Sequence, residues 1–224
     1  MKRLISVVLL IIMVTSACFS LFGCAFNREY DPEEVADAAR ELIKKSEVLN
    51  SIYYGEGLPY LNDPSYAEGL YFVADYYEMT KLGISNLDDL KDMTRSVFSK
   101  VLAESMINAS TSSVYEGEEL ILFSRYYQKY DPLTNEPVDI MVYSKFNPFL
   151  TDEVVYDYES VIATHSERDV VYVTINAVAT NEDGESQTNV LKIGLIEEED
   201  GWRLSTPTYT SYIDREEYEK LENK

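Results

Sequence analysis

Apolar residues recur at helical spacing in two stretches of the chain. The first stretch is residues 31–53, and its apolar face consists of Val35, Ala38, Ala39, Leu42, Leu49 and Ile52. The run Asp31-Pro32-Glu33-Glu34 supplies a capping side chain, a first-turn proline and an acidic first turn, so we expect this helix to begin there. A second apolar stripe, formed by Leu90, Met93, Val97 and Val101, predicts one helix over residues 85–107.

From residue 120 onward the apolar period shortens to two, which is the pattern of successive strands. The predicted strands span 120–130, 139–145, 154–165, 170–180, 187–197 and 202–209, and one earlier strand spans 69–75. Turn-forming residues separate the later strands, notably at 181–184 and 199–201. Helices followed by a long meander predict an α+β fold, in which the N-terminal helices pack on a curved antiparallel sheet.

The first 23 residues have the order of a secretory signal peptide. Lys2 and Arg3 precede a largely apolar run of 11 residues, Leu4 to Val14, which is too short to cross a hydrocarbon layer of about 30 Å. Leu21-Phe22-Gly23-Cys24 then resembles a bacterial lipoprotein processing box. We therefore expect Cys24 to carry a lipid that anchors the protein on the extracytoplasmic face of the membrane. Cys18 as a competing site and an uncut anchor are the alternatives.

Charge and cysteine content narrow the classes of function. Removing residues 1–23 leaves 17 Lys+Arg against 40 Asp+Glu, a net charge of −23, which repels nucleic acid and anionic lipid headgroups. Basic proteins, cationic peptides or divalent cations are the matching partners, although solubility alone also explains the charge. With Cys24 lipidated and Cys18 removed, no thiol remains, and His165 is the one histidine. We therefore expect no cofactor, no metal centre and no enzymatic activity.

A crowded acidic rim is the candidate binding surface. If all the strands form one meander, the loops 131–138, 166–169 and 197–201 meet at the same end of the sheet. The candidate partner-binding residues are Glu167, Asp169, Glu197, Glu198, Glu199 and Asp200. The same loops bring Asp131, Glu136 and Asp139 to that rim, which is also compatible with loose calcium binding. The competing interpretation is a rim of solvated charges at strand ends.

Two other side chains have alternative interpretations. His165 precedes the 166–169 turn, where it is either a general base beside carboxylates or a bystander at a strand end. Trp202 follows a tight turn and is expected to plug the core. The many tyrosines (19 in the chain) suit packing in strands and also stacking on sugars or peptides.

The order of the elements resembles the cone-shaped NTF2-like and cystatin-like folds. Within residues 31–130, the runs Gly57-Leu58-Pro59-Tyr60, Ser85-Asn86-Leu87-Asp88-Asp89 and Val97-Phe98-Ser99 resemble a Firmicutes envelope group. That group includes the IseA-type inhibitors of cell-wall DL-endopeptidases. The resemblance implies a cell-wall hydrolase as the target. Together with the predicted location and the charge, it leads us to expect a binding protein that inhibits this hydrolase by occluding it with the acidic loop surface. The alternative is a small molecule or glycan bound in a pocket between the helices and the sheet; an enzyme built on that pocket ranks third.

These expectations divide the chain into four parts. Residues 1–23 form the lipoprotein signal peptide, and 24–30 form a tether. Residues 31–213 form a single α+β domain, and 214–224 form a charged C-terminal tail.

Overall fold

The computed structural model describes residues 30–116 and 119–211. The expected signal peptide, Cys24 and the expected tail over 214–224 lie outside the described residues. The helices are α2 (Pro32–Tyr54), α3 (Tyr76–Lys81), α4 (Leu87–Val97) and α5 (Lys100–Thr111), with a short 3-10 turn η1 (Pro64–Tyr66). The strands are β1 (Ala67–Glu68), β2 (Tyr71–Val73), β3 (Val114–Glu116), β4 (Glu119–Leu122), β5 (Tyr126–Tyr130), β6 (Pro137–Tyr143), β7 (Glu153–Glu167), β8 (Val170–Thr180), β9 (Ser186–Glu198) and β10 (Gly201–Leu204). The fold is α+β, as the sequence predicts.

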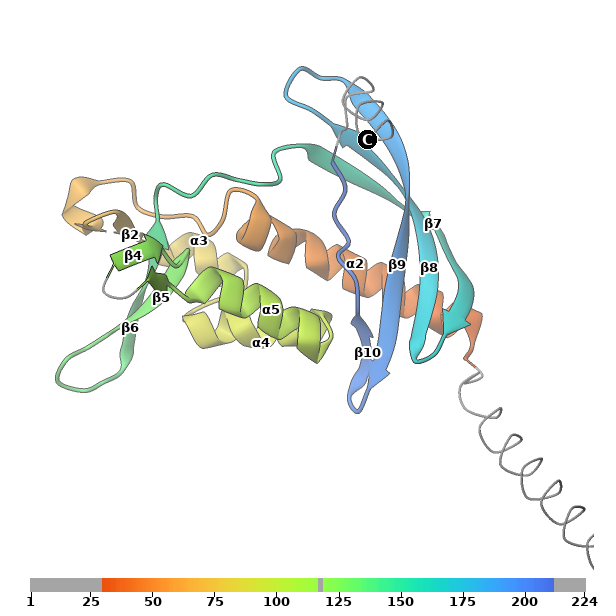
Figure 1. The fold of residues 1–224 in the computed structure, drawn as a ribbon, viewed down its shortest axis with the longest axis horizontal. Coiled ribbons are helices and arrows are strands. Elements are labelled where there is room, and N and C mark those ends of the chain that lie inside the picture. The colour runs from red at the N-terminus through yellow and green to blue at the C-terminus, as the bar shows by residue number, and fades with distance from the viewer. Residues whose placement is uncertain (1–29, 117–118, 212–224) are drawn as a thin grey trace, which may run out of the picture.

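Eight of the described strands divide between two antiparallel sheets that lie at opposite ends of the helices (Figure 1), and β3 pairs with β4 separately. One sheet has the order β1-β2-β6-β5, and the other is the meander β10-β9-β8-β7. The prediction of one continuous meander is therefore wrong, and the single curved cone is not confirmed. The division falls at residues 144–152, where Pro148 lacks the N–H that a sheet ladder needs.

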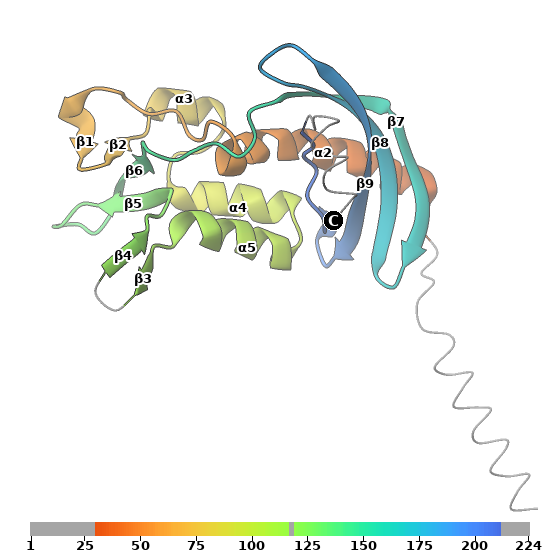
Figure 2. The ribbon, with the colours of Figure 1, turned by 45° about the horizontal axis from the view of Figure 1, so that its top comes forward.

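Helix α2 begins where the sequence places it and connects the two ends of the molecule (Figure 2). The Asp31 carboxylate accepts a hydrogen bond from the backbone N–H of Glu33 at 2.9 Å. The buried face of α2 packs against β7, β8 and β10. This packing confirms that the first helix lies on a curved antiparallel sheet, although only the last four strands form that sheet.

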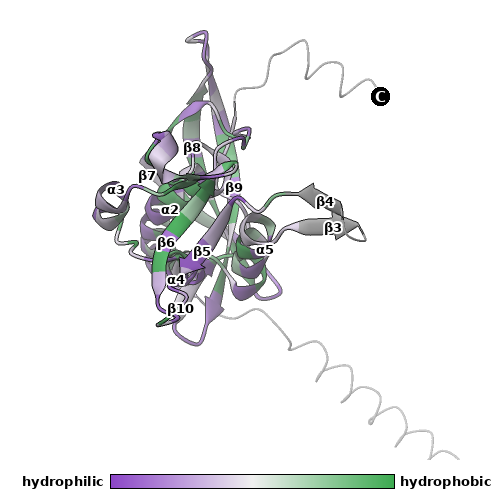
Figure 3. Ribbon diagram, turned by 90° about the vertical axis from the view of Figure 1, so that its left-hand side faces the viewer, coloured by the Kyte–Doolittle hydropathy of each residue, from purple (hydrophilic) through white to green (hydrophobic). Residues whose placement is uncertain are grey.

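One continuous core joins the helices to both sheets. The alternating apolar residues of the strand predicted over 170–180 form the buried face of β8, including Val173 and Ile175, and β9 continues this face with Ile193 and Leu195. From the other sheet, Tyr126 and Ile140 enter the same core. Hydrophobic stretches accordingly run along β6, β8 and β9 (Figure 3).

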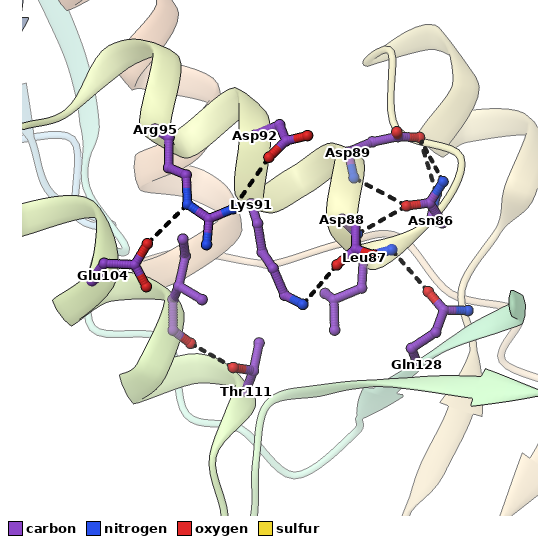
Figure 4. Close-up of polar contacts among 11 residues, drawn as sticks. Asn86, Leu87, Asp88, Asp89, Lys91, Asp92, Arg95, Glu104, Thr111 and Gln128 are labelled. Carbon is purple, nitrogen blue, oxygen red and sulfur yellow. Dashed lines mark hydrogen bonds and ion pairs between the residues drawn. The ribbon is translucent and has the colours of Figure 1, made fainter. Parts of the chain in front are cut away.

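The helix predicted over 85–107 is two helices, α4 and α5. Asn86 and Asp89 form a capping box at the start of α4, and the side-chain oxygen of Gln128 on β5 accepts from the Leu87 N–H at 2.8 Å (Figure 4). The helix ends at Phe98, which is extended and forms a parallel bridge with Leu204. This break turns the next helix, so that Val101 is 84% exposed rather than part of an inner stripe.

Three other predicted boundaries are corrected. The strand predicted over 120–130 is two strands, β4 and β5, and α3, which the side chain of Asp75 caps, was not predicted. The last strand ends at Leu204 instead of residue 209. Beyond it the chain crosses α2, where the buried Thr208 hydroxyl contacts Ser46 at 2.5 Å and accepts from the Asn50 amide at 3.0 Å. Within the described residues, no helix combines the length and apolarity needed to cross a membrane.

Candidate functional site

The two tight turns of the C-terminal sheet place the predicted carboxylates at one end. Glu167 pairs with Val170, Val170 pairs with Ile196, and Gly201 pairs with Glu198, so the β7–β8 and β9–β10 turns lie side by side (Figure 1). We call Glu167, Asp169, Glu197, Glu198, Glu199 and Asp200 the acidic loop end. Positive φ angles at Arg168 (56°) and Gly201 (124°) allow the chain to reverse here.

The third loop predicted for this end lies elsewhere. Residues 131–136 join β5 to β6 in the other sheet, and Asp139 lies on β6, so Asp131, Glu136 and Asp139 do not belong to the acidic loop end. The Asp131 carboxylate accepts from the backbone N–H groups of Leu133 and Thr134, and these hydrogen bonds lower its pKa. Its role is to shape its own turn.

A cleft of about 200 Å³ opens beside the acidic loop end. Asp169 and Glu197 contribute carboxylates to its wall, Arg168 contributes one guanidinium group, and Tyr30 and Trp202 contribute aromatic rings. Trp202 packs against the core and also lines the cleft, so its prediction as a core plug is incomplete. Its indole N–H donates to Glu34 at 3.4 Å, a long contact that joins the cleft to the first turn of α2.

Two of the six carboxylates serve the fold. Glu198 accepts from the backbone N–H of Lys100 at 2.9 Å, and Asp200 pairs with Arg203. The Arg203 side chain in turn donates through Nε to the backbone oxygen of Arg95 at 3.0 Å. These contacts fix the β9–β10 turn against α4 and α5.

Three carboxylates of the acidic loop end point to solvent. Glu167, Asp169 and Glu199 are exposed, and none forms a hydrogen bond or ion pair with another described residue. Glu197 lies in the cleft wall beside them. An exposed group of negative charges around an aromatic-walled cleft is suited to a basic ligand surface.

His165 is an exposed residue on the outer face of the sheet. Its ring stacks on Tyr172 with centroids 4.9 Å apart, and its Nδ1 lies 3.1 Å from the Thr164 hydroxyl. Lys192 covers the same tyrosine at 4.1 Å from the ring centroid. Among the described residues no carboxylate hydrogen-bonds to the imidazole, which favours the bystander interpretation.

Several tyrosines support packing rather than recognition. The Tyr126 hydroxyl donates to the backbone oxygen of Ile52 at 2.6 Å and accepts from the Leu58 N–H at 3.1 Å. The Tyr53 hydroxyl lies 2.8 Å from the Thr94 hydroxyl. Burial raises the pKa of Tyr53 and Tyr126 to about 12. Both residues belong to the core.

Loose calcium binding has no preformed site in the part of the chain that the structure describes. No group of three or more His, Cys, Asp or Glu side chains there is arranged to hold a metal ion. Comparison of the chain with family models, curated proteins and solved structures finds no match.

Proposed function

We propose that the chain is a lipid-anchored extracytoplasmic binding protein that holds a basic partner protein at its acidic loop end. The partner class that we propose is a cell-wall hydrolase, which the bound domain inhibits by covering its substrate groove. The observation that carries the docking surface is the exposed trio Glu167, Asp169 and Glu199 beside the cleft of Tyr30 and Trp202. The hydrolase as target is supported by the sequence resemblance alone.

The chemistry of the surface favours a protein partner. Exposed carboxylates steer a positively charged surface during encounter and fix its register. Tryptophan is among the residue types that most often dominate the binding free energy at a protein interface, and Trp202 is half-buried at the cleft. Since the cleft is only about 200 Å³, it is suited to one anchoring side chain of a larger surface.

The proposed anchor places this surface near the membrane. Tyr30 lines the cleft and lies six residues after Cys24, so the connecting chain spans at most about 22 Å. The repulsion between anionic headgroups and the acidic loop end is screened over about 8 Å at physiological ionic strength. An acidic surface can therefore lie within the reach of this connecting chain from the membrane. A partner bound at the acidic loop end therefore lies close to the membrane.

The test is inhibition of cell-wall hydrolysis by the full chain. Purified cell walls are digested by a DL-endopeptidase of the same host, and turbidity is followed with increasing amounts of the chain. We expect dose-dependent slowing, weakened at least about fivefold in the triple variant Glu167→Gln, Asp169→Asn, Glu199→Gln. The matched control is Glu136→Gln, Glu182→Gln, Asp183→Asn, which removes three exposed charges elsewhere. Equal inhibition by both triple variants, or none by the unmodified chain, would refute the proposal.

A further inference from the structure

The outer face of the C-terminal sheet, on the side away from α2, carries exposed apolar side chains. Alternate residues of β8 are buried against the core, and the residues between them face outward. On this outward side Val155, Ile162 and Val190 are 60%, 62% and 69% exposed, so none of the described elements covers them. Strands β7, β8 and β9 lie side by side (Figure 1), which places these three residues on one surface.

This surface, which we call the outer sheet face, is nearly neutral. The register of the strands assigns its central residues, which are Val155, Asp157 and Ile162 of β7, Thr174, Asn176 and Val178 of β8, and Thr188, Val190 and Lys192 of β9. Among the outward positions of residues 170–180 and 186–196, Lys192 is the one charged side chain, although 26% of the chain is charged. A neutral surface with exposed apolar side chains on an acidic protein is typical of an interface.

The two charges nearest the centre of the outer sheet face lie on opposite sides of β8. Asp157 of β7, Asn176 of β8 and Val190 of β9 form one row across the sheet, and Lys192 lies in the next row. The Lys192 ammonium group is held over the Tyr172 ring, 4.1 Å from the centroid. Asp157 is exposed, and its side chain forms no hydrogen bond or ion pair with another described residue. A negative charge therefore lies on one side of β8 and a positive charge on the other.

We propose that two copies of this chain pair through their outer sheet faces, about a twofold axis parallel to β8. This axis lays β7 of each copy over β9 of the other. Asp157 then lies over Val190 of the other copy, one row or about 7 Å along the strand from Lys192, a step that a lysine side chain can bridge. Ile162 lies over the methylene stem of Lys192, and Asn176 faces Asn176 of the other copy. The charges of the face are thus complementary to those of a second copy.

The place where the described chain begins favours the same axis. Tyr30 lines the cleft at the acidic loop end, and the proposed lipid on Cys24 lies six residues before it. An axis parallel to the strands keeps both acidic loop ends, and with them both anchors, at one end of the pair. Two copies anchored in one membrane can therefore pair, and a partner protein meets two acidic loop ends, which raises avidity. This consequence rests on the proposed function, whereas the pairing of the faces does not.

The size of the outer sheet face sets the expected strength of the dimer. The 11 residues of β8 extend about 36 Å and three strands are about 14 Å wide, so each copy buries about 500 Å². Two such faces bury about 1,000 Å², which is less than the about 1,600 Å² of a standard stable interface. We therefore expect a reversible dimer with a dissociation constant in the micromolar range. Anchoring in a membrane favours this dimer because it confines the copies to one surface.

Cysteine crosslinking in intact cells tests this arrangement. Position 176 lies on the proposed axis, so Asn176→Cys places two thiols opposite each other, and the processed, lipidated chain has no other thiol. A short bismaleimide should then join two full chains into a covalent dimer. The matched control is Leu133→Cys, a residue that is 94% exposed in the turn between β5 and β6 of the other sheet, and it should give monomer.

Sedimentation equilibrium of the purified chain, with no other protein present, measures the affinity of the dimer. Val190→Asp places a charge on the apolar face and should weaken the dimer at least about tenfold, whereas Leu133→Asp should change nothing. Lys192→Glu should weaken it at least about threefold, and the double variant Asp157→Lys, Lys192→Glu should restore most of the loss. Melting temperatures show that each variant is folded.

Three results would overturn the proposal. These are a chain that stays monomeric at high micromolar concentration, equal crosslinking from positions 176 and 133, and an unchanged dissociation constant in Val190→Asp. Because these measurements contain no hydrolase, a failure here is distinct from a failure of the inhibition test.

Discussion

Glu198 is predicted to stabilise the fold rather than to contact a partner, although it belongs to the acidic loop end. Helix α5 begins at Lys100, and the side chain of its cap residue Ser99 makes no capping hydrogen bond. The Glu198 carboxylate, from the end of β9, instead accepts from the Lys100 N–H at 2.9 Å. Substitution Glu198→Ala removes this acceptor and the negative charge at the start of α5.

The expected cost follows from these two effects. Loss of a capping acceptor costs about 1 kcal/mol, and loss of a favourable charge at a helix N-terminus costs about 0.3–1 kcal/mol. We expect Glu198→Ala to lower the free energy of unfolding by about 1–2 kcal/mol. In a domain of this size each kcal/mol lowers the melting temperature by about 2–4 °C.

Urea unfolding followed by circular dichroism measures this difference. The matched control is Glu199→Ala, the next residue along the chain, which is exposed and makes no polar contact with a described residue; its effect should stay within about 0.5 kcal/mol. Equal stability of the two variants would refute the capping role. A larger loss in Glu199→Ala would contradict the division of the acidic loop end into structural and exposed carboxylates.

Three further predictions concern the core and the anchor. Burial raises the pKa of Tyr126 to about 12, so above pH 10 this tyrosine ionises in the unfolded chain before it ionises in the folded one. The free energy of unfolding should therefore fall between pH 10 and 12, by about 3 kcal/mol from this residue. The variant Tyr126→Phe should reduce this fall, and it should cost about 1–3 kcal/mol at pH 7 because two hydrogen bonds are lost. An unchanged alkaline slope in Tyr126→Phe, measured by urea unfolding at each pH, would contradict this. Thr208→Val keeps the shape of the side chain but leaves the Asn50 amide without its acceptor, which should lower the free energy of unfolding in urea by about 1–3 kcal/mol. A stability equal to that of the unmodified chain would show that this contact is unimportant. Cys24→Ser should move the protein from the membrane fraction to the soluble extracytoplasmic fraction, and continued sedimentation with membranes would argue for an uncut anchor.

Local signals predicted those parts of the fold that depend on neighbouring residues. Asp31 and Pro32 predict the start of α2, and the helix predicted from residue 85 begins at Leu87, after the capping box of Asn86 with Asp89, because capping acts within one turn. Alternation in 170–180 predicted the buried face of β8 for a similar reason. These elements required no knowledge of the rest of the chain.

The errors arise where distant residues determine the structure. The helix breaks at Phe98, which pairs with Leu204 far along the chain, and the local signal is weak because Ser99, the cap residue of α5, makes no side-chain capping hydrogen bond. Similarly, the hypothesis of one meander places 131–138 at the wrong end of the molecule, since strand order depends on tertiary packing. Tyr30 and Trp202 meet at one cleft only because α2 and β10 lie together. Spacing along the sequence does not contain that information.

Site-specific photo-crosslinking in intact cells tests whether the acidic loop end docks a partner protein. A photo-reactive residue replaces Glu199 in one strain and Glu182, an exposed turn glutamate at the other end of the sheet, in a second. We expect position 199 to crosslink to a basic, membrane-associated cell-wall hydrolase and position 182 not to do so. No adduct at position 199, or the same adducts from both positions, would contradict it.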